Sequence, residues 1–198
     1  MNTAVLDRGL RRIPAWTLYV ASLGWAAWLF WSALTGQMGP EPINALERAY
    51  GLVALKLLVA GLCISPLRTY AGINLLRFRR AIGLSAFFFV VAHLTVWAVL
   101  DVQTFARVWE AIAKRPYVMV GMASFVLLLP LAVTSNNRSI RALGASWRRL
   151  HMLTYPAAIL AGVHFIWLVK GTPPQPFIYM AVLLGLIALR LPRWIRRS

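Results

Sequence analysis

The three histidines of this chain all lie in long segments without charged residues. His93 lies within residues 81–100, whereas His151 and His164 lie within residues 150–169, and each segment has 20 residues with no Asp, Glu, Lys or Arg. An ionisable residue inside a membrane span is costly and marks a functional site by default. Imidazole is also a common axial ligand of haem iron. For any single histidine the alternative is a buried side chain that is hydrogen-bonded to a backbone carbonyl.

His93 and His164 are expected at nearly the same depth in the membrane, because both segments are predicted to run from the inside to the outside. His93 follows Arg80 by 13 residues, or about 20 Å of helix, and His164 follows Arg149 by 15, or about 22 Å. Both imidazoles then lie past the midplane toward the outer face, where they can bind one haem iron from two sides. His151 comes two residues after Arg149 and is expected at the inner face.

An inner site built on His151 lacks an obvious second ligand. The 13 residues from His151 to His164 rotate a straight helix by about 220°, so the two do not share a face. Pro156 lies between them and can kink the helix. The third apolar segment offers Arg79 or Arg80 where a partner histidine would be needed. The inner site is therefore expected to bind something other than a six-coordinate haem.

Basic residues beside the apolar segments are candidate contacts for an anionic group. Haem propionates, a flavin phosphate and lipid headgroups are all open as partners, and lipid is the simplest for any single arginine. Lys56, near the middle of the second apolar segment, is interpreted as extending its amine to the membrane surface. Pairing with a cofactor carboxylate or phosphate is the alternative. The candidate arginines are Arg77, Arg79, Arg80 and Arg148.

Composition places the chain among polytopic membrane proteins. Of its 198 residues 60% are hydrophobic and 13% are charged, and the mean hydropathy is +0.68. The net charge of +16 comes from basic residues at the ends of apolar runs, which argues against nucleic-acid binding. A single cysteine, Cys63, excludes an intramolecular disulfide and a cysteine-ligated iron–sulfur cluster.

The apolar pattern predicts an all-α membrane protein with a six-transmembrane-helix bundle in one integral membrane domain. Six spans put both termini on one side, which carries 15 Lys and Arg residues against five on the other. The positive-inside rule then places both termini in the cytoplasm. The basic start is expected to lead into a retained first span. Residues 65–80, 101–115 and 134–149 are expected as loops, with Pro66 ending the second helix. The predicted spans are residues 13–34, 46–64, 81–100, 117–134, 150–169 and 177–191.

Other function classes fit the residues less well. The chain has no GxGxxG motif, so electrons must come from a lipid-soluble donor or a separate protein rather than from a Rossmann-bound nicotinamide. A small transporter whose histidines relay protons is an alternative. The third to sixth segments hold no acidic residue and the chain shows no internal repeat, which counts against it.

Three strings resemble the ferric reductase-like membrane domain family, which also occurs in NADPH oxidases. Within that family the chain is most similar to the haem-binding membrane subunits of protein-methionine-sulfoxide reductase systems. The resemblance covers the central two-thirds of the chain, and the combination of RRxxGL, His93, LGxxWxRLHxLxY and His164 is specific. The strings are SPLR at 65–68, RRAIGLSAFFFVVAHLTVW at 79–97 and TSNNRSIRALGASWRRLHMLTYPAAILAGVHFIW at 134–167.

The resemblance implies an electron-transfer subunit of the bacterial inner membrane that binds haem b and FMN. It implies that electrons come from quinol and pass to a periplasmic molybdopterin subunit that reduces methionine sulfoxide in oxidised proteins. His93 and His164 would be the haem ligands, with His151 assisting at the inner site. Two-haem members carry two histidines on each of two helices, whereas this chain has one on its third segment, so one haem b is expected, or two if His151 finds another partner. A cytochrome that reduces another acceptor, such as ferric iron, stays open.

Overall fold

A computed structural model describes residues 12–169 and 171–190 of the chain. The regular structure of these residues is entirely helical. Five helical segments are long and apolar enough to cross a membrane, whereas α10, with 15 residues, is apolar but shorter. The all-α, multi-pass membrane class is therefore confirmed, and a sixth crossing by α10 stays a prediction. Expectations that lie outside the described residues concern Arg8, Arg11, Lys170, Leu191, Arg193, Arg196 and Arg197.

The chain divides into two compact units at Val108–Trp109, within α5. One integral membrane domain covering both units stays a prediction. The helices of the first unit are α2 (Thr17–Leu34), α3 (Pro42–Tyr70), the 3-10 helix η1 (Leu76–Phe78), α4 (Arg79–Thr95) and the π-helix η2 (Val96–Val102). After α5 (Phe105–Lys114), the second unit has α6 (Pro116–Val133), α7 (Asn137–Leu143), α8 (Ala145–Leu150), the 3-10 helix η3 (His151–Leu153), α9 (Thr154–Leu168) and α10 (Pro174–Ala188).

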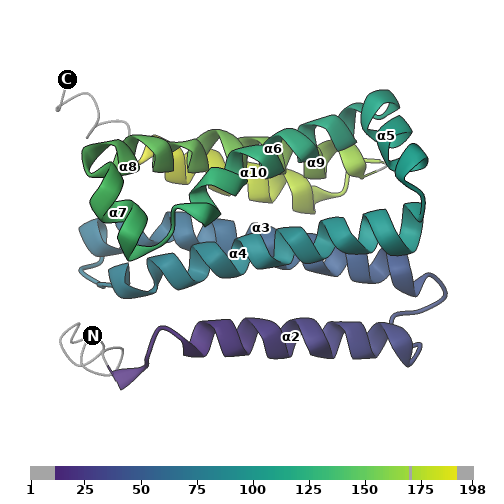
Figure 1. Ribbon diagram of the computed structural model, residues 1–198, viewed down its shortest axis with the longest axis horizontal. Coiled ribbons are helices and arrows are strands. Elements are labelled where there is room, and N and C mark those ends of the chain that lie inside the picture. The colour runs from purple at the N-terminus through teal and green to yellow at the C-terminus, as the bar shows by residue number, and fades with distance from the viewer. Residues whose placement is uncertain (1–11, 170, 191–198) are drawn as a thin grey trace. The chain divides into compact units, whose positions relative to one another are not determined.

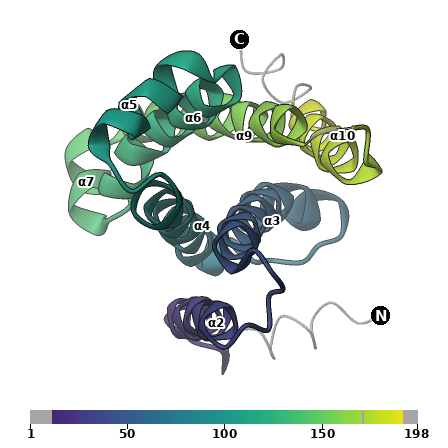
Figure 2. The same cartoon turned by 90° about the vertical axis from the view of Figure 1, so that its right-hand side faces the viewer.

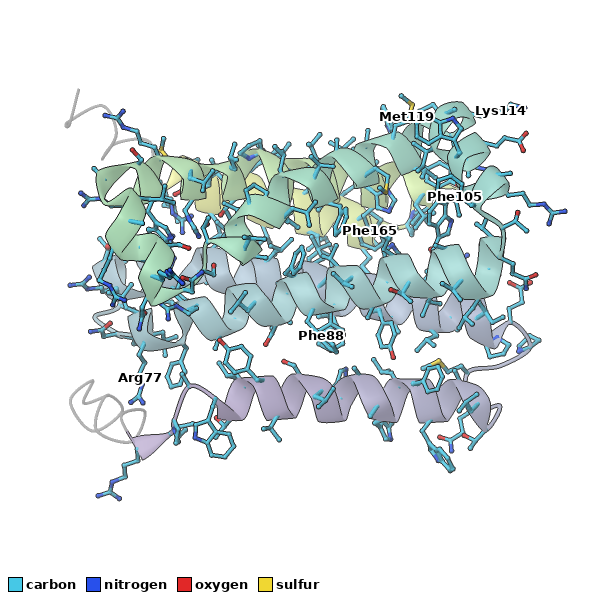
Figure 3. All side chains as sticks on the ribbon, in the orientation of Figure 1. Arg77, Phe88, Phe105, Lys114, Met119 and Phe165 are labelled. Carbon is cyan, nitrogen blue, oxygen red and sulfur yellow. The ribbon has the colours of Figure 1, made fainter. Side chains whose placement is uncertain are left out.

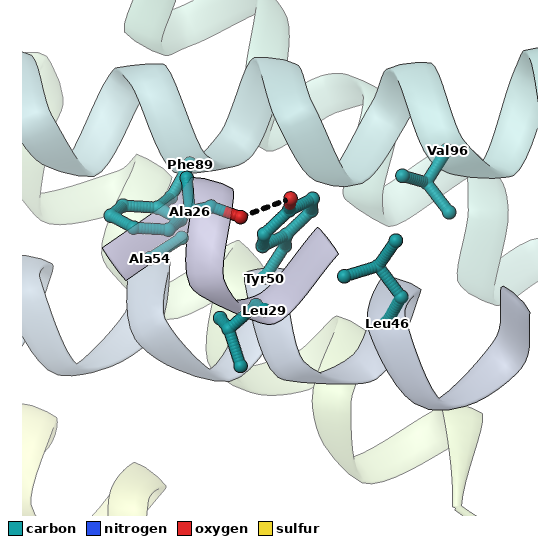
Figure 4. Close-up of a cluster of buried hydrophobic side chains, with 7 residues drawn as sticks. All are labelled: Ala26, Leu29, Leu46, Tyr50, Ala54, Phe89 and Val96. Carbon is teal, nitrogen blue, oxygen red and sulfur yellow. Dashed lines mark hydrogen bonds between the residues drawn. The ribbon is translucent and has the colours of Figure 1, made fainter. Parts of the chain in front are cut away.

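In the first unit α3 and α4 run antiparallel and side by side, with α2 packed against them (Figure 1; Figure 2). The helices bury a core of aliphatic and aromatic side chains. The Tyr50 hydroxyl of α3 also donates a buried hydrogen bond of 2.9 Å to the carbonyl of Ala26 in α2. This hydrogen bond restrains the position of the two helices along their axes. The core residues, drawn in Figure 4, are Ala26, Leu29, Leu46, Tyr50, Ala54, Phe89 and Val96.

In the second unit α9 packs between α6 and α10, and small residues bring the helices close. Ala157 and Ala158 of α9 are fully buried. The Ser124 hydroxyl of α6 donates a hydrogen bond of 2.8 Å to the Ala157 carbonyl. Gly162 of α9 gives room to Met180 of α10, whose Cε would lie 2.7 Å from a Cβ on that glycine. Close approach of helices at small residues is typical of membrane proteins.

Large apolar side chains remain exposed on the outer faces of these helices. Leu23 of α2 is 63% exposed and Val126 of α6 is 56% exposed, near the middle of segments that hold no charge. Water would make this arrangement costly, but lipid chains solvate such side chains as well as a protein core does. The exposed apolar faces are therefore the surfaces that contact the membrane.

The prediction that Pro66 ends the second helix is wrong. Helix α3 continues through Pro66 to Tyr70. Proline removes one backbone donor, and one turn before the end of a helix this costs a single hydrogen bond. The chain leaves the helix at Gly72, whose φ of 70° is a left-handed conformation that glycine adopts without strain.

The other two predicted loops also contain helices. Residues 101–115 include the end of η2 and all of α5, and residues 134–149 include α7 and most of α8. Helix α7 begins after Asn136, whose side chain accepts a hydrogen bond from the Ser139 backbone N–H at 2.8 Å. The charges in these segments suggested loops, but short amphipathic helices carry the same charges on one face.

Candidate functional site

His93 lies near the C-terminal end of α4, against the neighbouring helix α3. Its ring nitrogen Nδ1 is 2.9 Å from the backbone carbonyl oxygen of Glu47. The ring also passes close to Gly51, where a Cβ would stand only 3.1 Å from Nδ1. His93, the Glu47 carbonyl and Gly51 form the His93 cluster, which lies entirely within the first unit.

His164 has the same surroundings in the second unit. It lies near the C-terminal end of α9, and its Nδ1 is 2.6 Å from the backbone carbonyl oxygen of Tyr117 in α6. A Cβ at Gly121 would stand 2.8 Å from this nitrogen. His164, the Tyr117 carbonyl and Gly121 form the His164 cluster. In both clusters the carbonyl and the glycine are four residues apart, on the same face of the helix.

The two carbonyl contacts fix the protonation pattern of both rings. A backbone carbonyl can only accept a hydrogen bond, so Nδ1–H donates in each neutral imidazole and the lone pair is on Nε2. Metal-ligating histidines commonly use one nitrogen in this way while the other binds the metal. His93 and His164 are half-buried in apolar helices, and donation from Nδ1 is the tautomer in which Nε2 is the nitrogen with the chemistry to bind a metal.

The donor set suits a haem better than a bare metal ion. Within residues 12–169 and 171–190 there is no group of three or more His, Cys, Asp or Glu side chains that could hold an ion. A protein-only site for a transition metal uses three or four such ligands. Haem iron takes four nitrogens from the porphyrin and needs only one or two from the protein, so isolated imidazoles fit it.

His151 is held differently from the other two histidines. It begins η3, and its Nδ1 lies 3.1 Å from the carbonyl of Trp147, four residues earlier in the chain. Its Nε2 lies 3.5 Å from the Ser135 hydroxyl, and its ring stacks on the Trp147 indole at a centroid distance of 3.8 Å. The indole N–H in turn donates to the Thr134 carbonyl at 2.9 Å. His151 therefore has protein partners at both ring nitrogens.

The candidate arginines lie at the other end of the helices from His93 and His164. Arg79 precedes His93 by 14 residues in α4, which is about 21 Å along the helix axis. Arg77, labelled in Figure 3, is exposed beside the start of α4 and lies over the Phe78 ring at 5.2 Å. Arg80 and Arg148 are also exposed, and Arg148 is three residues from His151. Within their own units these arginines are too far to contact a group bound at His93 or His164.

Of two further cations, Lys56 and Arg190, only Arg190 occupies a place that the sequence alone did not reveal. Lys56 is exposed on the surface of α3, as expected for an amine that extends along its helix. Arg190 is the one charged residue that is buried in the described part of the chain, at 7% exposure. Its guanidinium donates to the Leu186 carbonyl at 2.8 Å and lies 5.6 Å from the centre of the Tyr155 ring. From the sequence alone, Arg190 counts among the basic residues of the C-terminal end, and this contact is not predicted.

The positions that hold the two histidines were also missed. The sequence singles out the imidazoles because they are rare and ionisable, but Glu47 and Tyr117 act through backbone atoms that every residue has. Gly51 and Gly121 are two among 13 glycines. Only the helix pairing shows which glycines face a histidine.

Comparison with known proteins places the chain in a family. Residues 49–162 match the family described as ferric reductase like transmembrane component. Proteins of Brucella ovis, Brucella canis and Brucella suis named protein-methionine-sulfoxide reductase heme-binding subunit MsrQ are each 44% identical over 179 residues, which is 90% of this chain and 81% of theirs. No solved structure matches the chain. From the extent of both matches, the chain belongs to the ferric reductase-like transmembrane family, with the MsrQ proteins as close relatives.

Proposed function

We propose that this chain is the haem-binding membrane subunit of a methionine-sulfoxide reductase and carries electrons to a separate catalytic subunit. The observation that carries the proposal is that the His93 cluster and the His164 cluster have the same local geometry, each within its own unit. Each presents an imidazole with its lone pair on Nε2, inside an apolar helix pair. The names of the MsrQ relatives supply the reductase system in which such a subunit would work.

His93 and His164 would be the axial ligands of one b-type haem, because both lie near the C-terminal ends of helices that are predicted to run in the same direction. When bound, haem supplies reversible one-electron redox chemistry. The chain itself supplies the two nitrogens, holds their rings by backbone carbonyls and surrounds them with apolar helices. Such surroundings keep water from the site and set the potential of the iron.

The inner end of each unit would serve electron entry. In this proposal the chain lies in the bacterial inner membrane, with both termini and the arginine-rich segments on the cytoplasmic side that the positive-inside rule favours. Quinol is the proposed donor, and FMN the proposed second cofactor. Arg77, Arg79, Arg80 and Arg148 are then exposed where a flavin phosphate or lipid headgroups could bind. His151 would assist at this inner site, and a periplasmic molybdopterin subunit would accept the electrons outside.

The experiment is a reduced-minus-oxidised absorption spectrum of the purified chain, with a haem-to-protein ratio and with quinol as reductant. The proposal expects a low-spin b-type spectrum at about one haem per chain, reduced by quinol. A ratio near two would assign a second haem to the inner site. Absence of haem under conditions that load other membrane cytochromes would overturn the proposal.

The family description favours ferric iron as a second candidate acceptor. The two acceptors are separated by reoxidation of the quinol-reduced protein. The reductase role is supported if the catalytic subunit with methionine sulfoxide reoxidises the protein. A ferric chelate should then reoxidise it no faster than it reoxidises an unrelated control cytochrome. The reverse pattern supports ferric reduction.

A further inference from the structure

We infer that Gly51 and Gly121 are positioning residues for the haem-ligating histidines, because a side chain at either position would press on the imidazole that is hydrogen-bonded to the carbonyl four residues earlier. The inference rests on the proposed haem ligation by His93 and His164. It assigns a role to two residues that bear no chemistry of their own and that lie on different helices from the ligands.

Helix geometry explains why glycine is required at these two positions. The Cα–Cβ bond of a helical residue tilts toward the N-terminus, so a side chain covers the turn that precedes it. A side chain at residue 51 would therefore cover the Glu47 carbonyl, and one at residue 121 would cover the Tyr117 carbonyl. The imidazole of the partner helix occupies that space in both clusters.

The two positions differ in how much room they leave. A Cβ at Gly121 would lie 2.8 Å from Nδ1 and 2.9 Å from Cε1 of His164, closer than real Cβ contacts come, so the ring must move. At Gly51 the corresponding distances to His93 are 3.1 and 3.3 Å, which a shift of a few tenths of an ångström relieves. The hydrogen bonds follow the same order, at 2.6 Å for His164 and 2.9 Å for His93. Alanine at residue 121 should therefore do more damage than alanine at residue 51.

The test compares Gly121→Ala and Gly51→Ala in the full-length protein. Loss of a partner that orients a metal ligand typically weakens metal binding about 10- to 100-fold. For Gly121→Ala we expect haem retention about tenfold weaker or worse, with loss of the low-spin bis-histidine signal in electron paramagnetic resonance and new binding of carbon monoxide to the reduced protein. Gly51→Ala should keep most of its haem, with a shifted midpoint potential and altered low-spin g values.

Three control glycines separate positioning from packing. An added Cβ at Gly83 in α4 or at Gly185 in α10 would meet open space. Alanine at these positions therefore shows the effect of replacing a helical glycine when the new side chain contacts nothing. Gly162 is the sharper control, because it lies two residues before His164 and its added Cβ would meet Met180 at 2.7 Å. Gly162→Ala should shift the flexible end of the Met180 side chain in the α9–α10 contact, yet keep the wild-type spectrum, g values and potential.

A readout without haem covers the case in which a variant loses the cofactor altogether. Nitrogen-15 resonances of histidine in the haem-free protein report which ring nitrogen is protonated. Wild type should show Nδ1 protonated in all three rings, since each has a carbonyl partner. Gly121→Ala should lose this pattern in the ring of His164 alone.

The possible outcomes separate the inference from the proposed function. Wild-type haem content, g values and potential in both Gly121→Ala and Gly51→Ala would overturn the inference, and so would equal changes in Gly162→Ala. If His93→Ala and His164→Ala retain wild-type haem, the ligand assignment itself fails. Haem loss in the histidine variants together with an unaffected Gly121→Ala leaves the function intact and removes only the role of the glycines.

Discussion

His93 and His164 are held by a neighbouring helix, whereas His151 is held largely by its own turn of chain. The carbonyl partners of the first two are 46 and 47 residues away in sequence, at Glu47 and Tyr117. The carbonyl partner of His151 is four residues away, at Trp147. A ring that is oriented by a second helix keeps its direction only while the helices are packed, so the orientation of His93 and His164, and with it the proposed ligation, depends on helix packing. At His151 the orientation is a local property.

The largest effect should come from removing the rings themselves. His93→Ala and His164→Ala each take away a proposed ligand and should lose most of the bound haem, as measured by the haem-to-protein ratio. His151→Ala should lose little haem and change only the inner site. Equal haem contents in all three variants would contradict the distinction between helix-held and locally held histidines.

A smaller effect is expected when helix contacts elsewhere in the two units are weakened. Tyr50→Phe and Ser124→Ala each remove a buried interhelical hydrogen bond, to Ala26 and to Ala157. Each loss should lower the free energy of unfolding by about 1 kcal/mol, measured by unfolding in a mixed detergent. The haem spectrum should stay as in wild type. A changed spectrum at equal stability would mean that the histidines sense these contacts directly.

The locally held histidine should tolerate loss of its side-chain partner. The Ser135 hydroxyl lies 3.5 Å from His151 Nε2, at the limit of a hydrogen bond, and donates a shorter bond of 2.6 Å to Leu131. Ser135→Ala should therefore leave the haem-to-protein ratio and the midpoint potential unchanged. A loss of haem as large as in His164→Ala would show that this contact supports a ligand.

The smallest effect is expected for an exposed local pair. Lys114 donates to Glu110 at 2.7 Å on the surface of α5, and this hydrogen bond and charge raise the pKa of the Lys114 amine. A raised pKa stabilises the folded state below the unfolded pKa of lysine and ceases to do so as pH rises through the folded value. Glu110→Gln should leave the melting temperature at pH 7 within error, since exposed pairs contribute little. Any difference from wild type should disappear once the pH has risen above the raised pKa of the Lys114 amine.

The sequence was sufficient for the membrane class and for the histidines as candidate ligands. Long uncharged segments predict spans because the hydrocarbon core excludes charges, and that rule needs no knowledge of the fold. The prediction that the helix ends at Pro66 was wrong. One proline near the end of a helix removes a single backbone hydrogen bond, which costs less than the helix gains by continuing to Tyr70. The loop prediction also failed at residues 101–115 and 134–149, where charge marks either a loop or an amphipathic helix.

The sequence could not identify what holds the rings. The spacing between Glu47 and Gly51, or between Tyr117 and Gly121, occurs in many helices, and its meaning depends on which helix packs across it. The burial of Arg190 against Tyr155 depends in the same way on where α10 packs. Such contacts are set by helix pairing, which no local pattern in one chain specifies.

The confinement of each cluster to its own half of the chain has a consequence for biosynthesis. Every residue of the His93 cluster has been made once the chain reaches residue 93, whereas the His164 cluster needs 71 more residues. At a usual elongation rate of about 5–20 residues per second, this interval is roughly 4–14 s. During that time the nascent chain holds one finished histidine position and not the other. The proposed two-sided ligation by His93 and His164 can therefore begin only when most of the chain has been synthesised.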